Sequence, residues 1–78
     1  VVVAGLTTDH CCSTTARMAS DLGFEVWFVD DATATHAREL PDGRRFDAET
    51  MHESALASLS EEFAEIVDTA EAVRRVAR

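Results

Sequence analysis

One stretch decides the fold of this chain: VVVAGLTTDHC, residues 1–11. Its first four residues form a short apolar run, typical of a strand buried in a parallel sheet. Gly5 ends that run, a polar turn follows, and Cys11 stands where a helix-compatible segment begins. A helix N-terminus carries a partial positive charge, which favours a thiolate over a thiol, and its free N–H groups can hold a developing oxyanion. The stretch therefore indicates a cysteine nucleophile between a strand and a helix.

The segment after this turn predicts a helix over about residues 10–22. Asp9 or Thr8 would cap its N-terminus, and Gly23 stands where a glycine commonly ends a helix. Small and apolar residues at helical spacing predict the face that packs inward. That face would consist of Cys11, Thr15, Ala19 and Leu22.

The remaining sequence predicts two more strands and two more helices. The strands cover residues 24–29 and 65–67, and Asp47 caps a helix over about 48–60. The buried face of that helix would consist of Met51, Ala55, Leu56, Leu59 and Phe63. Asp68 or Thr69 would cap the last helix, which would be anchored by Val73 and by Val76 or Ala77. The order β-α-β-loop-α-β-α predicts an α/β fold, the C-terminal half of a three-layer α/β/α (Rossmann-like) parallel-sheet domain.

The polar segment over residues 30–45 is expected to be an irregular loop. It contains Pro41-Asp42-Gly43, a turn signal, and its length suggests a functional or docking role. His36 in this loop and His52 on the following helix are expected to have surface or packing roles, because no spacing of His and Cys in the chain makes a metal-binding motif. We therefore expect neither a metal site nor a cofactor.

Bulk composition excludes several classes of protein. The chain has 78 residues, a net charge of −8 and no lysine, so it lacks the basic surface that nucleic-acid binding requires. No apolar run approaches the ~20 residues of a membrane span. The neighbouring Cys11 and Cys12 do not suit a structural disulfide, and a reducing cytoplasm is the expected location. Because the chain opens inside a buried-strand pattern, residues 1–78 are interpreted as the C-terminal portion of a single larger domain.

The segments GLTTDHC (5–11), STTARMA (13–19) and DLGFEV (21–26) resemble the nucleophile region of the isochorismatase-like cysteine hydrolases. That group includes nicotinamidases, N-carbamoylsarcosine amidases and isochorismatases. The resemblance continues through residues 31–34 and 46–50 to 65–69, so it spans nearly the whole chain. It departs from the family at Cys12, where an apolar residue is usual, so Cys12 is interpreted as a small buried hydrophobe.

The resemblance implies a specific chemistry for the parent protein. Cys11 would attack the carbon of a small amide-type substrate, expel ammonia or an amine, and leave a thioester that water hydrolyses. The backbone N–H groups of Thr7 and Cys11 would form the oxyanion hole, next to a cis peptide between Leu6 and Thr7. The family's catalytic Asp and Lys would lie before Val1. Members usually form homo-oligomers, for which residues 30–45 are an interface candidate.

Alternatives remain open at this point. Isochorismatase itself cleaves a vinyl ether and does not need the cysteine, so the bond type is not fixed. A second interpretation is that the chain is a truncated, non-catalytic fragment that associates through its exposed N-terminal strand. A thiol redox protein using Cys11 and Cys12 is disfavoured, because a redox motif has two residues between its cysteines. His10 is expected to line the pocket rather than serve as a base, because adjacent helical side chains diverge by about 100°.

Overall fold

The computed structural model describes residues 1–76. The elements, in chain order, are β1 (Val2–Leu6), a π-helical turn η1 (Thr8–Cys12), α1 (Ser13–Asp21), β2 (Trp27–Ala34), β3 (Arg38–Glu39), β4 (Arg45–Phe46), α2 (Ala48–Glu62), β5 (Glu65–Val67) and α3 (Thr69–Val76). The molecule is elongated, 49 Å along its longest axis and 18 Å along its shortest. None of the helices in this part of the chain has the length and apolar character needed to cross a membrane.

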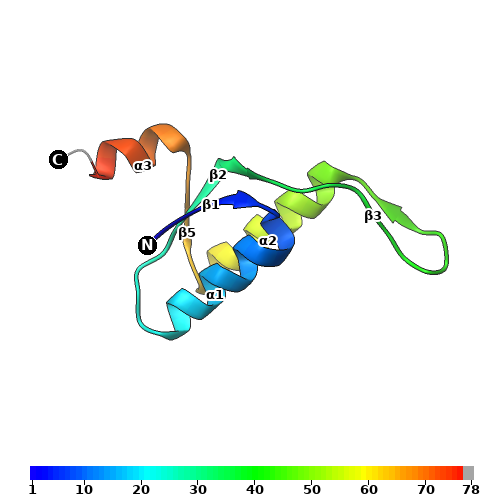
Figure 1. Ribbon diagram of the computed structural model, residues 1–78, viewed down its shortest axis with the longest axis horizontal. Helices are drawn as coiled ribbons and strands as arrows, with labels where there is room; N and C mark the ends of the chain where they lie inside the picture. Colours follow the sequence, from blue (N-terminus) through cyan, green and yellow to red (C-terminus); the bar gives the residue numbers. More distant parts are fainter. Residues whose placement is uncertain (77–78) are drawn as a thin grey trace.

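A three-stranded parallel sheet in the order β1-β2-β5 forms the centre of the fold. α1 and α2 cover one of its faces and α3 lies against the other (Figure 1). Successive residues of β2 point to opposite faces, as in any strand, so Phe28 packs with α1 and α2 while Val29 packs with α3. The predicted three-layer α/β architecture is confirmed.

The bounds of two strands differ from those expected. The first apolar run covers residues 1–4, but β1 extends to Leu6, and it lies at the edge of the sheet over the described residues. β2 is central, and it runs to Ala34 rather than ending at Val29. It continues past its apolar residues because its backbone pairs with β1 again after a shift in register between Val3 and Gly5, with Gly5 opposite Thr33 and Leu6 opposite Ala34.

The predicted inward face of the first helix is wrong except at Ala19, which is partly buried and packs against the core. Its buried residues are Thr8, Cys12, Ser13 and Ala16, whereas Cys11 and Thr15 are exposed and Leu22 is 70% exposed. The reason is the π-helical turn, in which the Cys12 amide bonds the Thr7 carbonyl at 3.1 Å, five residues back. A π-helical turn holds more residues than an α-helical one, so the phase shifts and Cys12 turns inward in place of Cys11. Gly23 ends the helix as predicted, with a φ of 92°.

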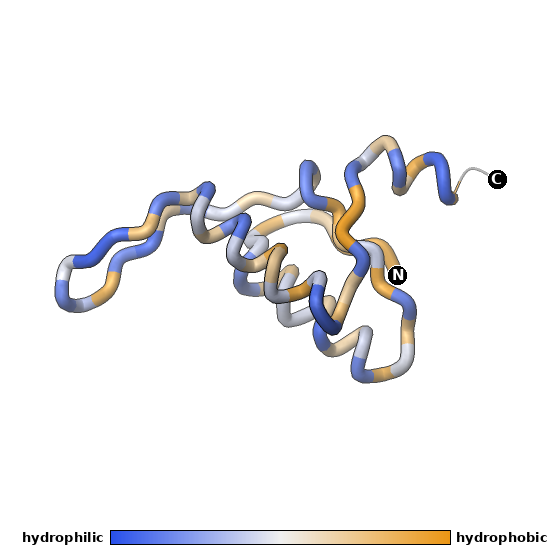
Figure 2. The backbone as a smooth tube through the Cα atoms, turned by 180° about the vertical axis from the view of Figure 1, so that it is seen from behind, coloured by the Kyte–Doolittle hydropathy of each residue, from blue (hydrophilic) through white to orange (hydrophobic). Residues whose placement is uncertain are grey.

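Half of the segment expected to be an irregular loop is strand. After the end of β2, β3 and β4 pair as an antiparallel hairpin, with Arg38 opposite Phe46 and Glu39 opposite Arg45. The turn predicted at Pro41-Asp42-Gly43 closes it, and the Gly43 amide bonds the Leu40 carbonyl at 2.9 Å. We call residues 35–47 the hairpin arm; it projects from the body at the end of β2 (Figure 1). It is largely hydrophilic, whereas hydrophobic segments gather where the strands meet (Figure 2).

The last two helices follow their predicted caps but not all their predicted contacts. The Asp47 side chain accepts from the Thr50 amide at 2.7 Å, and α2 follows with Leu59 fully buried. Asp68 caps α3 in the same way, through the Glu71 amide at 2.7 Å. The expected anchors Val73 and Val76 are exposed, and the third candidate, Ala77, lies outside the described residues.

α3 is held by other side chains instead. Ala72 packs on Val29 and Val67. Arg75 bonds Glu71 at 2.7 Å and Glu65 at 2.6 Å while lying over the Trp27 ring. These polar contacts determine which face of α3 packs against the sheet, and the spacing of apolar residues does not predict them.

Candidate functional site

Cys11 is an exposed free thiol in η1, the turn that follows β1, two residues before α1 begins. Two shallow surface depressions meet at this residue. The first, of about 240 Å³, is lined by Val1, Val2, Val3, Ala4, Leu6, Cys11, Cys12 and Thr15. The second, of about 540 Å³, is lined by Asp9, His10, Cys11, Thr14 and Thr15. Cys11 therefore lines both depressions. Apolar residues line most of the first, and Asp, His and Thr residues line most of the second, which we call the polar depression.

The backbone around Cys11 is tightly wound. The Thr7 carbonyl accepts from the His10 amide at 3.2 Å and from the Cys12 amide at 3.1 Å. The peptide bond between Leu6 and Thr7 is cis. The turn thus ends β1 and starts the helix within a few residues, which places the Cys11 side chain outside the core.

Cys12 has the opposite environment from its neighbour. Only 5% of the residue is exposed, and it packs with Val3, Ala16 and Phe28 in the core beneath α1. Burial raises the pKa of the Cys12 thiol, and the neighbouring Cys11 raises it further. Because a raised pKa keeps the thiol protonated, Cys12 is the poorer nucleophile of the two.

Asp9 does not cap the helix as expected. Its carboxylate accepts from Arg38 Nε at 2.6 Å and Nη2 at 3.1 Å, and from the Thr35 hydroxyl at 2.7 Å. Hydrogen bonds from Arg38 hold the pKa of Asp9 well below its usual range, against the opposing effect of burial. The carboxylate is therefore an ionised anchor between the Cys11 turn and the base of the hairpin arm.

Thr8, on the same turn, is fully buried and bonds to α2. Its hydroxyl lies 2.7 Å from His52 Nδ1, and His52 Nε2 lies 3.0 Å from the Asp30 carbonyl oxygen. A carbonyl oxygen only accepts, so Nε2 carries the proton and Nδ1 of the neutral ring accepts from Thr8. His52 therefore joins α2, β2 and the Cys11 turn, a packing role of the kind expected for it.

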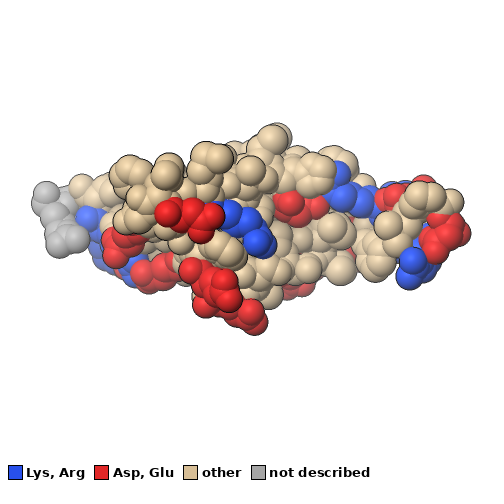
Figure 3. Space-filling view, turned by 90° about the horizontal axis from the view of Figure 1, so that it is seen from below, with Lys and Arg blue, Asp and Glu red and all other residues tan. Residues whose placement is uncertain are grey.

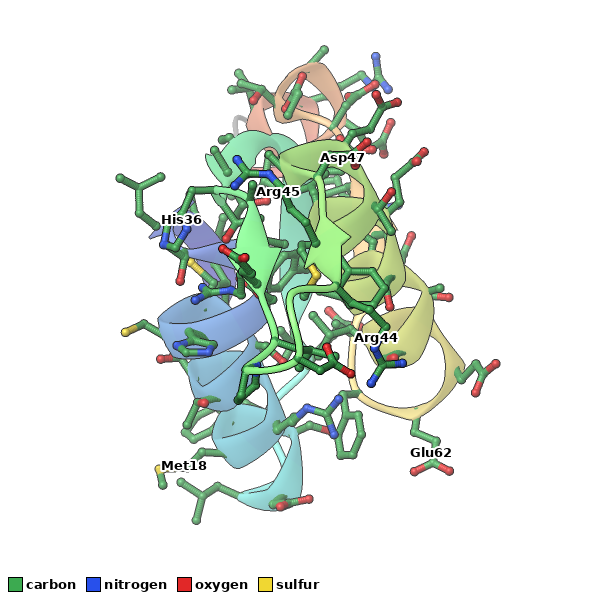
Figure 4. The ribbon with its side chains drawn as sticks, turned by 90° about the vertical axis from the view of Figure 1, so that its right-hand side faces the viewer. Met18, His36, Arg44, Arg45, Asp47 and Glu62 are labelled. Atoms are coloured by element: carbon green, nitrogen blue, oxygen red, sulfur yellow. The ribbon has the colours of Figure 1, made fainter. Side chains whose placement is uncertain are left out.

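The other histidines contribute less to the site. His10 is exposed and lines the polar depression beside Cys11. His36 Nδ1 lies 2.9 Å from the carbonyl of Ala37, at the outer side of the arm (Figure 4). Within residues 1–76 no group of His, Cys, Asp or Glu is placed to hold a metal ion.

Sequence reasoning missed three residues that hold the Cys11 turn: Thr35, Arg38 and His52. A signal for His52 was present, since it precedes Leu56 and Leu59 at helical spacing and so lies on the buried face of α2. Nothing in the pattern of residues 30–45 singles out Thr35 or Arg38, because their partner Asp9 lies 26 and 29 residues earlier.

A sequence model of one family, the isochorismatase domain, matches residues 1–71 of this chain. The chain belongs to the isochorismatase family. It is 46% identical, over 69 residues, to the isochorismatase family protein YrdC of Bacillus subtilis. It is 44% identical, over 68 residues, to nicotinamidase 3 of Arabidopsis thaliana.

Solved structures of the isochorismatase family share the fold of this chain. A hydrolase of the family from Chromobacterium violaceum superposes with a TM-score of 0.87 at 34% identity, over 94% of this chain. A family protein from Burkholderia xenovorans gives a TM-score of 0.89 at 30% identity, over 97% of it. The chain spans only part of these proteins: 37% of the B. subtilis relative, 29% of the Arabidopsis one, and 38% and 36% of the two structures.

Proposed function

We propose that the full-length protein hydrolyses a C–N bond of a small amide-type substrate, with Cys11 as its nucleophile. The observation that carries this proposal is the contrast between two adjacent cysteines. Cys11 is exposed where two depressions meet, and Cys12 is a buried thiol with a raised pKa. A structural role would account for Cys12 but not for Cys11. The nicotinamidase name of the Arabidopsis relative supports an amide substrate.

The proposed reaction has two stages. The Cys11 thiolate attacks the amide carbon, and the carbonyl oxygen becomes an oxyanion held by the backbone N–H groups of Thr7 and Cys11. The C–N bond then breaks, the amine takes up a proton and leaves, and a thioester to Cys11 remains. Water attacks the thioester, which releases a carboxylic acid and restores the thiol. The family resemblance implies an Asp that shuttles the proton and a Lys that steadies the site; neither is assigned to a residue here, and the chain has no lysine.

The test uses nicotinamide and a panel of small primary amides, with ammonia release as the assay. Cys11→Ala should abolish turnover while circular dichroism shows an intact fold, and Cys12→Val should stay close to wild type. Hydroxylamine added during turnover should trap the acyl group as a hydroxamate in the wild type only. Turnover retained by Cys11→Ala would overturn the assignment of the nucleophile.

A second proposal concerns association. β1 pairs only with β2 among the described residues, and Val1, Val2 and Leu6 are exposed along it. An exposed, apolar edge strand is a site for pairing with another chain, so the 78-residue chain alone should self-associate without catalysis. Light scattering tests this, and Val2→Lys, which places a charge on the edge, should yield monomer. For the full-length enzyme, we propose that it forms an oligomer through the hairpin arm. We also propose that it works in a reducing cytoplasm, which keeps Cys11 as a thiol.

A further inference from the structure

Asp9 connects the Cys11 turn to a part of the chain far away in sequence. It lies in η1, two residues before Cys11, and only 9% of its side chain is exposed. Its partners are Thr35, just after β2, and Arg38, the first residue of β3. The hairpin arm therefore reaches back and is fixed to the turn that carries the proposed nucleophile.

The geometry of this contact is more restrictive than a single ion pair. Arg38 donates from Nε to one oxygen of the Asp9 carboxylate and from Nη2 to the other. Thr35 donates to the oxygen that receives Nη2. A guanidinium that meets both oxygens of a carboxylate fixes the orientation of that carboxylate as well as its distance. Lysine, with one compact charge, supplies no such fork.

Asp9 itself is an unsuitable acid or base for the reaction. Three donors occupy its two oxygens, and the lowered pKa keeps it ionised at neutral pH. Its carboxylate also belongs to the polar depression that Cys11 lines, so an unpaired charge there would face the substrate. Arg38 both neutralises this charge and holds it in place.

We propose that Arg38 is a positioning residue for Cys11: its two-point contact with Asp9 fixes the turn that presents the Cys11 thiol and the Thr7 and Cys11 amides to the substrate. The inference rests on the proposed function. A displacement of about 1 Å in a reacting group costs roughly 100-fold in rate, so a contact that restrains this turn governs kcat without touching the substrate.

The test compares Arg38→Gln with Arg44→Gln in the full-length protein. Arg44 is the matched control, because it also lies on the arm and pairs with a carboxylate, that of Asp42, in the exposed turn (Figure 4). Arg38→Gln should lower kcat for the amide probe by about 10- to 100-fold with little change in KM, and Arg38→Lys should recover part of the loss. Arg44→Gln should match the wild type.

A second readout needs no substrate. The His10 and Cys12 amides bond the Thr7 carbonyl, so their hydrogen exchange reports how firmly the turn is held. Arg38→Gln and Asp9→Asn should each speed this exchange by about tenfold or more, and the double variant should add nothing further. Unchanged exchange, additive effects, or faster exchange with normal kcat would each overturn the proposal. The proposed function is judged separately: turnover retained by Cys11→Ala removes it, whatever the Arg38 variants do.

Discussion

Replacing Thr8 with valine removes one hydroxyl from the core beside Cys11 and changes the shape of the side chain very little. Thr8 is fully buried, and the hydroxyl lost is the one that donates to His52 Nδ1 at 2.7 Å. The imidazole would keep its Nε2 bond to the Asp30 carbonyl but would have a half-buried acceptor without a donor. Leaving a fully buried acceptor unsatisfied costs about 1–3 kcal/mol, and because His52 is only half-buried we expect Thr8→Val to destabilise the protein by the lower end of that range, about 1 kcal/mol.

This cost is large enough to measure. At about 0.05–0.15 kcal/mol per residue, these 78 residues account for only about 4–12 kcal/mol of the stability of the domain to which they belong. Urea unfolding followed by the fluorescence of Trp27 would measure the change. Thr14→Val is the matched control, because Thr14 is exposed on α1, directly after η1, and this variant should fall within about 0.5 kcal/mol of wild type.

A double-mutant cycle with His52→Leu tests the reasoning itself. If Thr8 and His52 stabilise the fold through their mutual bond, the two losses overlap, and the double variant should be about 1 kcal/mol more stable than the sum of the single changes predicts. Additive losses within about 0.5 kcal/mol would refute the bond. Nitrogen NMR of the imidazole gives an independent check, since the ring should be the tautomer with its proton on Nε2.

Three further predictions concern the core and the thiols. Leu59→Ala should destabilise the fold by about 2–5 kcal/mol in urea unfolding, because it leaves a cavity at a fully buried site. Leu22→Ala, on the surface, should stay within about 0.5 kcal/mol of wild type. Equal losses for the two variants would contradict the packing described. Iodoacetamide should modify Cys11 in the native protein and leave Cys12 unmodified until urea unfolds the chain, as peptide mass spectrometry would show. The pKa of Asp9 is lowered from its ordinary 3.8, so its contribution to stability is complete above that pH and is lost as the pH falls below it. Asp9→Asn should flatten the acid side of the stability profile measured by circular dichroism, and an unaltered profile would show that other carboxylates dominate there.

The sequence predicts much of the fold because the informative signals are local. The apolar runs over residues 1–4 and 65–67 predict strands, Asp47 predicts the start of α2, and Gly23 predicts the end of α1. The strand boundaries are less accurate, because β2 pairs with β1 again beyond Asp30 and Asp31, at Thr33 and Ala34. The polarity of the side chains does not predict which backbone groups of β2 pair with β1.

The site is less predictable, because it is assembled by contacts between distant residues. The π-helical turn shifts the buried face from Cys11 to Cys12. α-Helical spacing does not predict this shift, because it assumes turns without the additional residue of a π-helical turn. The bond between Thr8 and His52 joins residues 44 apart. The acidic composition, by contrast, is plain in both sequence and structure, since acidic side chains cover more of the surface than basic ones on the face shown in Figure 3.

The hairpin arm is closed by its own backbone bonds, since the Leu40 amide bonds the Arg44 carbonyl at 2.8 Å beyond the paired strands. Its tip can therefore lengthen or shorten without a change in the register at its base. Insertions or deletions around Asp42 would leave Arg38 in place. The arm is thus a segment in which an isochorismatase-family protein can diversify while the geometry around its cysteine stays constant.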